Sequence, residues 1–234
     1  MDARTAGRRM TELLGLSTMP VAVTFASTAP AGVPRVARSA PAGCAYWKQA
    51  ALGATFYTEA ADHYNCPIGS YTHGVALPAA RATELEGVVG TMVGLQYIRM
   101  EEVAALPRRT DPFRVAVYAP LAEAPVPPDV VLVRGRARQI MLVAEAARAA
   151  GLAGDAAAMG RPACAMIPAV LAGPGGGVTS LGCIGNRVYT GLGDDELYFT
   201  IPGARVGDVV ERLEIVMHAN RELEKYHEGR RASL

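Results

Sequence analysis

The sequence predicts a mixed α/β (α+β) protein in which a mixed sheet is covered by helices. Short runs rich in β-branched residues alternate with segments whose apolar residues recur at helical spacing. Half of the 234 residues are apolar, which is enough to bury a sizeable core. Because strands and helices alternate along the whole chain, helices packed on a sheet are the expected way to cover both kinds of apolar face.

The expected strands are short apolar runs bounded by proline, glycine or polar residues. The clearest is the run Asp-Val-Val-Leu-Val at residues 129–133, and Val-Ala-Val occurs both at 21–23 and at 115–117. We therefore expect strands at residues 21–25, 54–58, 95–98, 115–118, 129–133, 178–181 and 196–201.

The expected helices carry an apolar stripe and end at glycine or proline. Gly15 is placed to end the first helix and Gly151 to end the helix with the clearest stripe, at 137–150. Pro78 suits the first turn of another helix. A proline-rich loop is expected at 28–41 and a frayed charged tail at 225–234. The expected helices are residues 5–16, 45–52, 78–85, 101–106, 137–150, 164–171 and 205–224, with a short helix or turn at 68–74.

The cysteines occur in two similar phrases, which indicates an internal repeat. Cys44 and Cys164 are each followed by alanine, whereas Cys66 and Cys183 each open a phrase that contains Ile, Gly, Tyr, Thr and a second Gly. A repeat of this kind shapes the whole fold when it is real. We therefore expect a single domain, residues 1–234, with duplicated halves at about 1–110 and 111–234 that form two similar lobes facing each other.

Composition and charge exclude several classes of partner. The formal net charge is +1, so no strong field would gather nucleic acid or an anionic membrane. No apolar run reaches the roughly 18 residues that indicate a spanning helix. Residues 1–9 are polar and are not followed by the apolar region of a secretory signal. The expected location is the cytoplasm, with neither nucleic acid nor membrane as a partner.

The four cysteines are the predicted metal ligands. In a reducing cytoplasm, cysteines favour metal, cluster or catalytic use over structural disulfides. Closely spaced cysteine pairs typical of zinc are absent, so separated single cysteines favour a [4Fe–4S] cluster. The predicted ligands are Cys44, Cys66, Cys164 and Cys183.

Each cysteine also has a plainer interpretation as a small buried apolar residue. For Cys164, the buried interpretation and a functional role fit equally well, because its neighbours are apolar. Cys66 and Cys183 each precede a glycine-containing polar turn, which favours a functional role for them. Cys44 precedes the helix expected at 45–52, whose positive end would favour a thiolate.

Other residues near the cysteines are candidates for binding or catalysis. Gly69 and Gly185 would let the backbone approach a cofactor and donate N–H groups to it. His63 and His73 could ligate metal or donate a proton. For His63, the alternative is an ordinary solvent-exposed histidine on a polar loop. Arg187 could hold an anionic substrate. Its plainer alternative is a surface ion pair with Asp194, Asp195 or Glu196.

These segments together resemble a family of unknown function. The matching segments lie at residues 20–23, 44–45, 55–57, 62–63, 66–69, 117–121, 129–133, 164–165, 181–187 and 195–202. Taken in order, they are similar to domain-of-unknown-function family 169, also labelled uncharacterised ArCR, over roughly residues 13–213. The resemblance implies that Cys44, Cys66, Cys164 and Cys183 belong to the family pattern. Ile184 stands where an aromatic residue is expected.

The sequence leaves three functional hypotheses. The first is an iron–sulfur protein that acts as an oxidoreductase or cluster-assisted enzyme, with a small-molecule substrate or an electron donor as its partner. The second is a non-enzymatic module that binds or senses a metal or cofactor. The third is a thiol enzyme in which Cys66 or Cys183 is the nucleophile and another cysteine resolves the intermediate. The small residues and the apolar last helix also allow a homodimer.

Overall fold

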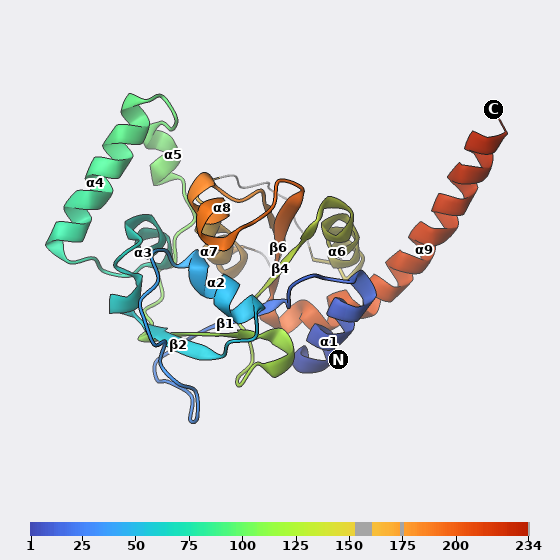
Figure 1. Ribbon diagram of the computed structural model, residues 1–234, viewed down its shortest axis with the longest axis horizontal. Helices are drawn as coiled ribbons and strands as arrows, with labels where there is room; N and C mark the ends of the chain where they lie inside the picture. Colours follow the sequence, from blue (N-terminus) through green and yellow to red (C-terminus); the bar gives the residue numbers. More distant parts are fainter. Residues whose placement is uncertain (153–160, 174–175, 234) are drawn as a thin grey trace.

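A computed structural model describes residues 1–152, 161–173 and 176–233 (Figure 1). The described strands form one sheet in the order β2-β3-β1-β4-β6-β5, and the pairings between neighbouring strands are antiparallel. The strands are β1 Val21–Ala26, β2 Phe56–Glu59, β3 Val115–Pro120, β4 Val130–Arg136, β5 Val178–Ser180 and β6 Glu196–Pro202. The predicted α/β architecture of a sheet covered by helices is confirmed, whereas the described strands form an antiparallel sheet and not the mixed sheet that was expected.

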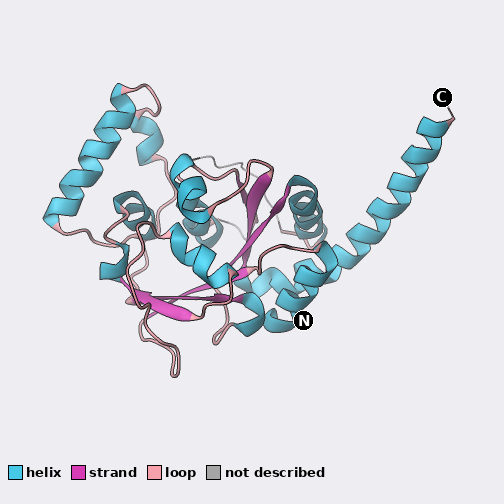
Figure 2. Ribbon diagram, viewed as in Figure 1, coloured by secondary structure: helices cyan, strands magenta, loops and turns pink. Residues whose placement is uncertain are grey.

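Each face of the sheet has its own apolar core, because side chains alternate between the two faces of a strand. In β1, Ala22 lies in one core, while Val21 and Val23 lie in the other. The first core is covered by α1 Ala3–Leu14, α6 Ala137–Ala149 and α9 Val206–Ala232. The second face carries α2 Cys44–Ala51, α3 Pro67–His73, α7 Met166–Ala172 and α8 Ile184–Thr190. The helices around the sheet are seen in Figure 2.

Short 3-10 turns join several of these elements. They are η1 Ala60–His63, η2 Leu121–Glu123, η3 Ala163–Ala165 and η4 Gly203–Arg205. The two ends of α1 are set by residues next to it in the sequence. Asp2 caps it by accepting a hydrogen bond from the Thr5 N–H at 3.0 Å, and Gly15 ends it in a left-handed conformation that glycine adopts without a steric penalty.

Two helical segments extend away from the sheet (Figure 1). One contains α4 Ala79–Gly94 and α5 Met100–Ala104, and neither helix has a buried residue. The other is the outer end of α9. Among the described helices, none is both long and apolar enough to cross a membrane.

Two expectations about these segments are wrong. The strand expected at 95–98 is absent, because α4 continues to Gly94 and the chain then turns through Gln96, which has a φ of 57°. A strand needs a sheet neighbour to pair with its backbone, and this segment lies away from the sheet. The tail expected to fray from residue 225 is helical to Ala232, and an ion pair between Glu222 and Lys225 lies one helical turn apart on α9.

The predicted repeat is not confirmed as two lobes, since all six described strands belong to one sheet. The strand order is nevertheless symmetric about its centre. β1 and β4 are central neighbours, β3 and β6 flank them, and β2 and β5 are the edges. The first three strands and the last three therefore follow the same relative order, although β3 lies beyond residue 110, where the first half was expected to end. The duplication itself stays a prediction.

Candidate functional site

The four cysteines occupy the beginnings of helical segments on the second face of the sheet. Cys44 is the first residue of α2, Cys66 is the N-cap of α3, and Cys183 is the N-cap of α8. Cys164 lies in η3, which runs directly into α7. Each of these segments lies in a connection between two consecutive strands, so residues far apart in sequence arrive on the same face. All four thiols are free.

The thiols influence one another electrostatically, which shows that they lie in one region. Cys66 and Cys183 both raise the pKa of Cys44, and the same two thiols and Cys44 raise the pKa of Cys164. Among the thiols, Cys66 has the largest effect on both Cys44 and Cys164. We call these four residues the thiol cluster: Cys44, Cys66, Cys164 and Cys183.

The predicted iron–sulfur function is contradicted by the arrangement of the ligands. Within the described residues, which include all four cysteines, no group of three or more Cys, His, Asp or Glu side chains could hold a metal ion. Electrostatic influence acts over several ångströms, whereas thiolate ligands must lie about 2.3 Å from one zinc ion. The thiols are near one another without forming a ligand set. The [4Fe–4S] cofactor stays a prediction of the sequence, and iron and acid-labile sulfide content measures it.

Burial keeps two of the thiols protonated. Desolvation is the largest effect on Cys44 and raises its pKa to about 12, and it raises the pKa of Cys164 even further. The Asn186 amide lies near Cys44 and favours the ionised thiol, but neither of its polar atoms has a hydrogen-bond partner among the described residues. The expectation that the start of α2 would stabilise a Cys44 thiolate is therefore wrong, because loss of water outweighs the helix dipole.

Cys66 and Cys164 are both held by contacts with α3. The Cys66 N–H donates to the His63 carbonyl at 3.0 Å, and the Cys66 carbonyl accepts from the Ser70 N–H at 2.8 Å. The Thr72 hydroxyl lies 3.3 Å from the Cys164 sulfur. Part of Cys164 reaches solvent, but its sulfur is desolvated by the surrounding protein. The helix that begins at Cys66 thus contacts Cys164 directly.

The two predicted glycines differ in their surroundings. A Cβ atom at Gly69 would lie 3.0 Å from the Cys66 sulfur, so a larger residue would crowd that thiol. A Cβ atom at Gly185 would meet only the Tyr189 ring, at an ordinary contact distance of 3.7 Å. Gly69 therefore makes room for Cys66, while Gly185 lies in α8, two residues after Cys183. Their predicted role in binding a cofactor stays a prediction.

His63 is buried beside the start of α2. Its Nε2 lies 2.8 Å from the Thr58 hydroxyl, and that hydroxyl donates to the Ala116 carbonyl at 3.3 Å. This assignment makes Thr58 the acceptor and places the imidazole proton on Nε2. Desolvation lowers the His63 pKa to about 4, although Asp62 opposes the shift. The solvated position considered for His63 is not what the structure shows.

His73 is buried at the end of α3. Its Nδ1 lies 2.9 Å from the Gly69 carbonyl and therefore carries the proton, which leaves Nε2 as an acceptor without a partner among the described residues. Desolvation, together with smaller effects of His63 and Arg109, lowers the His73 pKa to about 3, although the hydrogen bond to Gly69 opposes the shift. Both histidines are neutral at neutral pH. Their predicted catalytic roles stay predictions.

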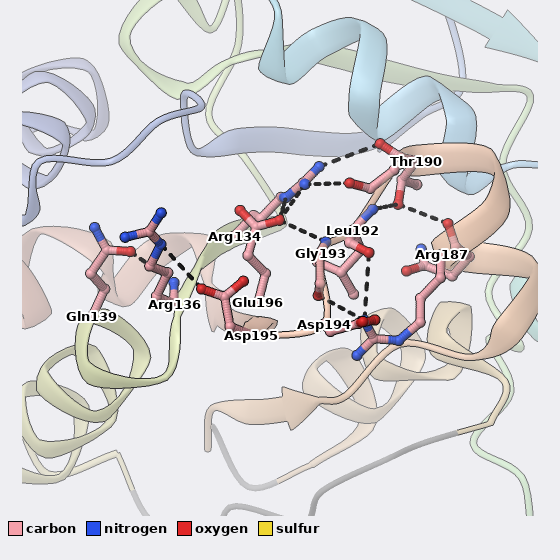
Figure 3. Close-up of polar contacts among 12 residues, drawn as sticks. Arg134, Arg136, Gln139, Arg187, Thr190, Leu192, Gly193, Asp194, Asp195 and Glu196 are labelled. Carbon is pink, nitrogen blue, oxygen red and sulfur yellow. Dashed lines mark hydrogen bonds and ion pairs between the residues drawn. The ribbon is translucent and has the colours of Figure 1, made fainter.

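Arg187 ties together the loops on either side of α8 (Figure 3). It donates to the Gly193 and Leu181 carbonyls, each at 2.7 Å, and lies 3.8 Å from a carboxylate oxygen of the exposed Asp194. Two of its donor groups are therefore already occupied by backbone carbonyls. This arrangement favours the plainer role considered for Arg187, although substrate binding by Arg187 stays a prediction.

A second arginine holds the end of α8 against β4 and β6 (Figure 3). Arg134 donates to the Gly191 carbonyl at 2.6 Å and pairs with Glu196 through both Nε and Nη2. Glu196 also accepts from the Gly193 N–H at 2.8 Å, and its carboxyl pKa is lowered by these hydrogen bonds and by the nearby arginines despite partial burial. The loop that follows α8 is thus fixed by a partly buried charge pair.

We expect Glu196→Gln to lower the free energy of unfolding by about 1–3 kcal/mol, because it leaves Arg134 without its countercharge. Urea unfolding at neutral pH measures the change. Asp195→Asn is the matched control, because Asp195 pairs with Arg136 at 3.2 Å while its side chain is 68% exposed. Exposed pairs contribute about 0–1 kcal/mol. Equal effects of the two substitutions would contradict the role of the partly buried pair.

Several residues around the site were not anticipated from the sequence. Thr72, Thr58 and Asn186 are polar residues on or beside elements that carry cysteines, and all three are buried. Arg109 lies over the rings of Phe25 and Phe113, at 4.5 and 5.2 Å from their centroids. The helical spacing of Cys66, Gly69 and His73 was a usable signal, since these positions share one face of α3.

The comparisons with known proteins add a family and no activity. No curated protein and no solved structure matches the chain. A family model described as uncharacterised ArCR matches residues 9–212, which is most of the chain and agrees with the resemblance found in the sequence. The chain therefore belongs to the DUF169 family of uncharacterised ArCR proteins.

Proposed function

We propose that this protein is a thiol enzyme that reduces small disulfides, with Cys66 as the nucleophile and Cys164 as the resolving thiol. The observation that carries the proposal is the position of Cys66. It is partly exposed, and it has the largest effect of any thiol on the pKa of both Cys44 and Cys164. A nucleophilic thiol must reach its substrate and must also lie near the thiol that resolves it.

The choice of Cys164 as the resolving thiol rests on packing. α3, which begins at Cys66, packs against η3, and Thr72 of α3 contacts the Cys164 sulfur. Cys164 is protonated because of its desolvation, so it does not compete as the first nucleophile. Cys44 is held neutral in the same way.

The proposed reaction transfers two electrons to the substrate. The Cys66 thiolate attacks one sulfur of a disulfide, forms a mixed disulfide and releases one thiolate. Cys164 then attacks the Cys66 sulfur, while its proton passes to a released thiolate. The products are two substrate thiols and a disulfide between Cys66 and Cys164. An external dithiol is the electron donor that restores the reduced protein.

A reducing cytoplasm would supply thiol reductants, so we place the protein there. The net charge of +1 gives no reason to expect nucleic acid as a partner. A homodimer is compatible with the exposed α4 and α5, and light scattering of the purified protein measures its mass.

We expect glutathione disulfide to produce an internal bridge between Cys66 and Cys164. The reduced full-length protein is incubated with glutathione disulfide, alkylated, digested and analysed by mass spectrometry. Cys44 and Cys183 are expected to stay alkylated, which makes them internal controls. A product without any bridge that includes Cys66 would overturn the proposal. Iron and sulfide are measured on the same protein.

A further inference from the structure

The Thr72 hydroxyl of α3 has two acceptors within reach and only one hydrogen to donate. Its Oγ1 lies 2.9 Å from the Gly69 carbonyl oxygen and 3.3 Å from the Cys164 sulfur. Thr72 is fully buried, so solvent does not provide another partner. The hydroxyl can therefore donate to the carbonyl or to the sulfur, but not to both at once.

The protonation state of Cys164 decides which of the two acceptors is stronger. A thiol sulfur accepts weakly, so the hydroxyl donates to the Gly69 carbonyl while Cys164 is protonated. A thiolate is charged and accepts a much stronger hydrogen bond. Desolvation raises the pKa of Cys164 most, whereas the hydrogen bond from Thr72 lowers it. Both acceptors already lie within hydrogen-bond distance, so only the O–H bond has to turn when Cys164 ionises.

The Gly69 carbonyl keeps a partner when the Thr72 hydroxyl turns away. His73 Nδ1 lies 2.9 Å from the same oxygen and donates to it. A buried carbonyl left without a donor would oppose the turn, and His73 removes that obstacle. The main chain of Thr72 is also fixed, because its carbonyl accepts from the Arg109 N–H at 2.8 Å. The surroundings of Thr72 therefore support both orientations of its hydroxyl.

We infer that Thr72 is a positioning residue for the resolving step, in which its hydroxyl turns from the Gly69 carbonyl to the Cys164 sulfur and stabilises the attacking thiolate. This inference rests on the proposed function, in which Cys164 resolves the mixed disulfide of Cys66. The Cys164 sulfur bonds to the Cys66 sulfur, and the bond from Cys66 to the substrate sulfur breaks. The proton that Cys164 loses passes to a released substrate thiolate. Thr72 keeps its own hydrogen throughout.

A single-turnover experiment separates the resolving step from the first attack. The reduced full-length protein is mixed with glutathione disulfide, quenched with acid at intervals and analysed by intact mass spectrometry. The spectra record the mixed disulfide of Cys66 and its conversion to the internal bridge. Thr72→Val, which lacks the hydroxyl, is expected to slow this conversion by at least about tenfold, because a hydrogen bond to a charged group is lost.

Three further variants show whether the hydroxyl itself is responsible. Thr72→Ser retains the hydroxyl and is expected to resolve the mixed disulfide at close to the wild-type rate, whereas Thr72→Ala lacks it and is expected to behave like Thr72→Val. Thr200→Val is the matched control and is expected to leave the conversion unchanged. Thr200 is also fully buried and donates to a carbonyl, that of Val178 at 3.0 Å, but it belongs to β6.

Alkylation tests the contact between Thr72 and Cys164 without any disulfide. Iodoacetamide reacts with thiolates, so its rate of reaction with Cys164 at a fixed alkaline pH follows the ionised fraction of that thiol. Peptide mass spectrometry measures the rate at Cys164 alone. Thr72→Val is expected to lower it by at least about tenfold, and Thr72→Ser is expected to restore it.

The outcomes distinguish this inference from the proposed function. Equal conversion rates in the wild type and Thr72→Val, or a loss in Thr72→Ser as large as that in Thr72→Val, would overturn the role of Thr72 and leave the disulfide chemistry standing. A wild-type protein that forms no mixed disulfide would instead overturn the proposed function, and with it the resolving step. An alkylation rate at Cys164 that does not fall in Thr72→Val would show that the hydroxyl does not stabilise the thiolate.

Discussion

Cys66→Ser is expected to slow the reduction of glutathione disulfide by at least about 100-fold. This is a conservative threshold, because enzymes that lose their nucleophile commonly slow by a much larger factor. The physical reason is that a serine hydroxyl does not ionise near neutral pH, whereas a thiol does so readily. The rate of glutathione release, followed in a coupled assay with an external dithiol, measures the effect. The result tests the assignment of Cys66 rather than the presence of thiols in general.

The other cysteines separate nucleophilic from resolving roles. Cys183→Ser is the matched control, since Cys183 is also a partly exposed N-cap residue, and it is expected to retain most of the rate. Cys164→Ser is expected to stop the reaction at the mixed disulfide of Cys66 with glutathione, which intact mass spectrometry detects. If Cys183→Ser loses the activity while Cys66→Ser keeps it, the nucleophile has been assigned to the wrong cysteine.

The protein is expected to lose stability steeply below about pH 6.5 because of His63 and His73. Burial lowers their pKa values to about 4 and about 3, from an ordinary value of 6.5. Below 6.5 the unfolded chain binds protons at these positions that the folded protein does not bind. The stabilisation is therefore complete above about pH 6.5 and is lost as the pH falls toward the two folded values. Each histidine contributes a slope of about 1.4 kcal/mol per pH unit.

Such a slope is large for a domain whose total stability is about 5–15 kcal/mol. Asp62 contributes only in more acidic solution. Despite partial desolvation, its carboxyl pKa is lowered by hydrogen bonds from Glu59 and Ser39 and by Arg35. The stabilisation that Asp62 provides is therefore lost only below its ordinary pKa of 3.8. The histidines therefore dominate between about pH 6 and about pH 5.

Urea unfolding across that interval measures the slope. His73→Gln is expected to remove about half of it, whatever its effect at neutral pH, because glutamine does not titrate. His218→Gln is the control, since His218 is exposed on α9. A wild-type free energy of unfolding that is constant across the interval would show that the two histidines are not buried in their neutral form.

Local signals in the sequence were enough to locate most elements. Gly15 marks the end of α1, and the apolar run at 129–133 marks β4, because capping and β-branched side chains act through near neighbours in the chain. The same reasoning failed at 95–98, where an apolar segment resembles a strand but has no sheet beside it. No helix was predicted at the residues of α8, because seven residues are too few to show a clear helical periodicity.

The sequence by itself determined that Cys66 and Cys183 each open a polar turn, and that the cysteines recur in two similar phrases. Only the tertiary structure decided what those thiols can do. It placed Cys44 and Cys164 where desolvation keeps them protonated, made Cys66 their strongest thiol neighbour, and buried both His63 and His73. The physical reason is that burial and electrostatic coupling depend on distances between segments far apart in the chain, which spacing within a single segment does not encode.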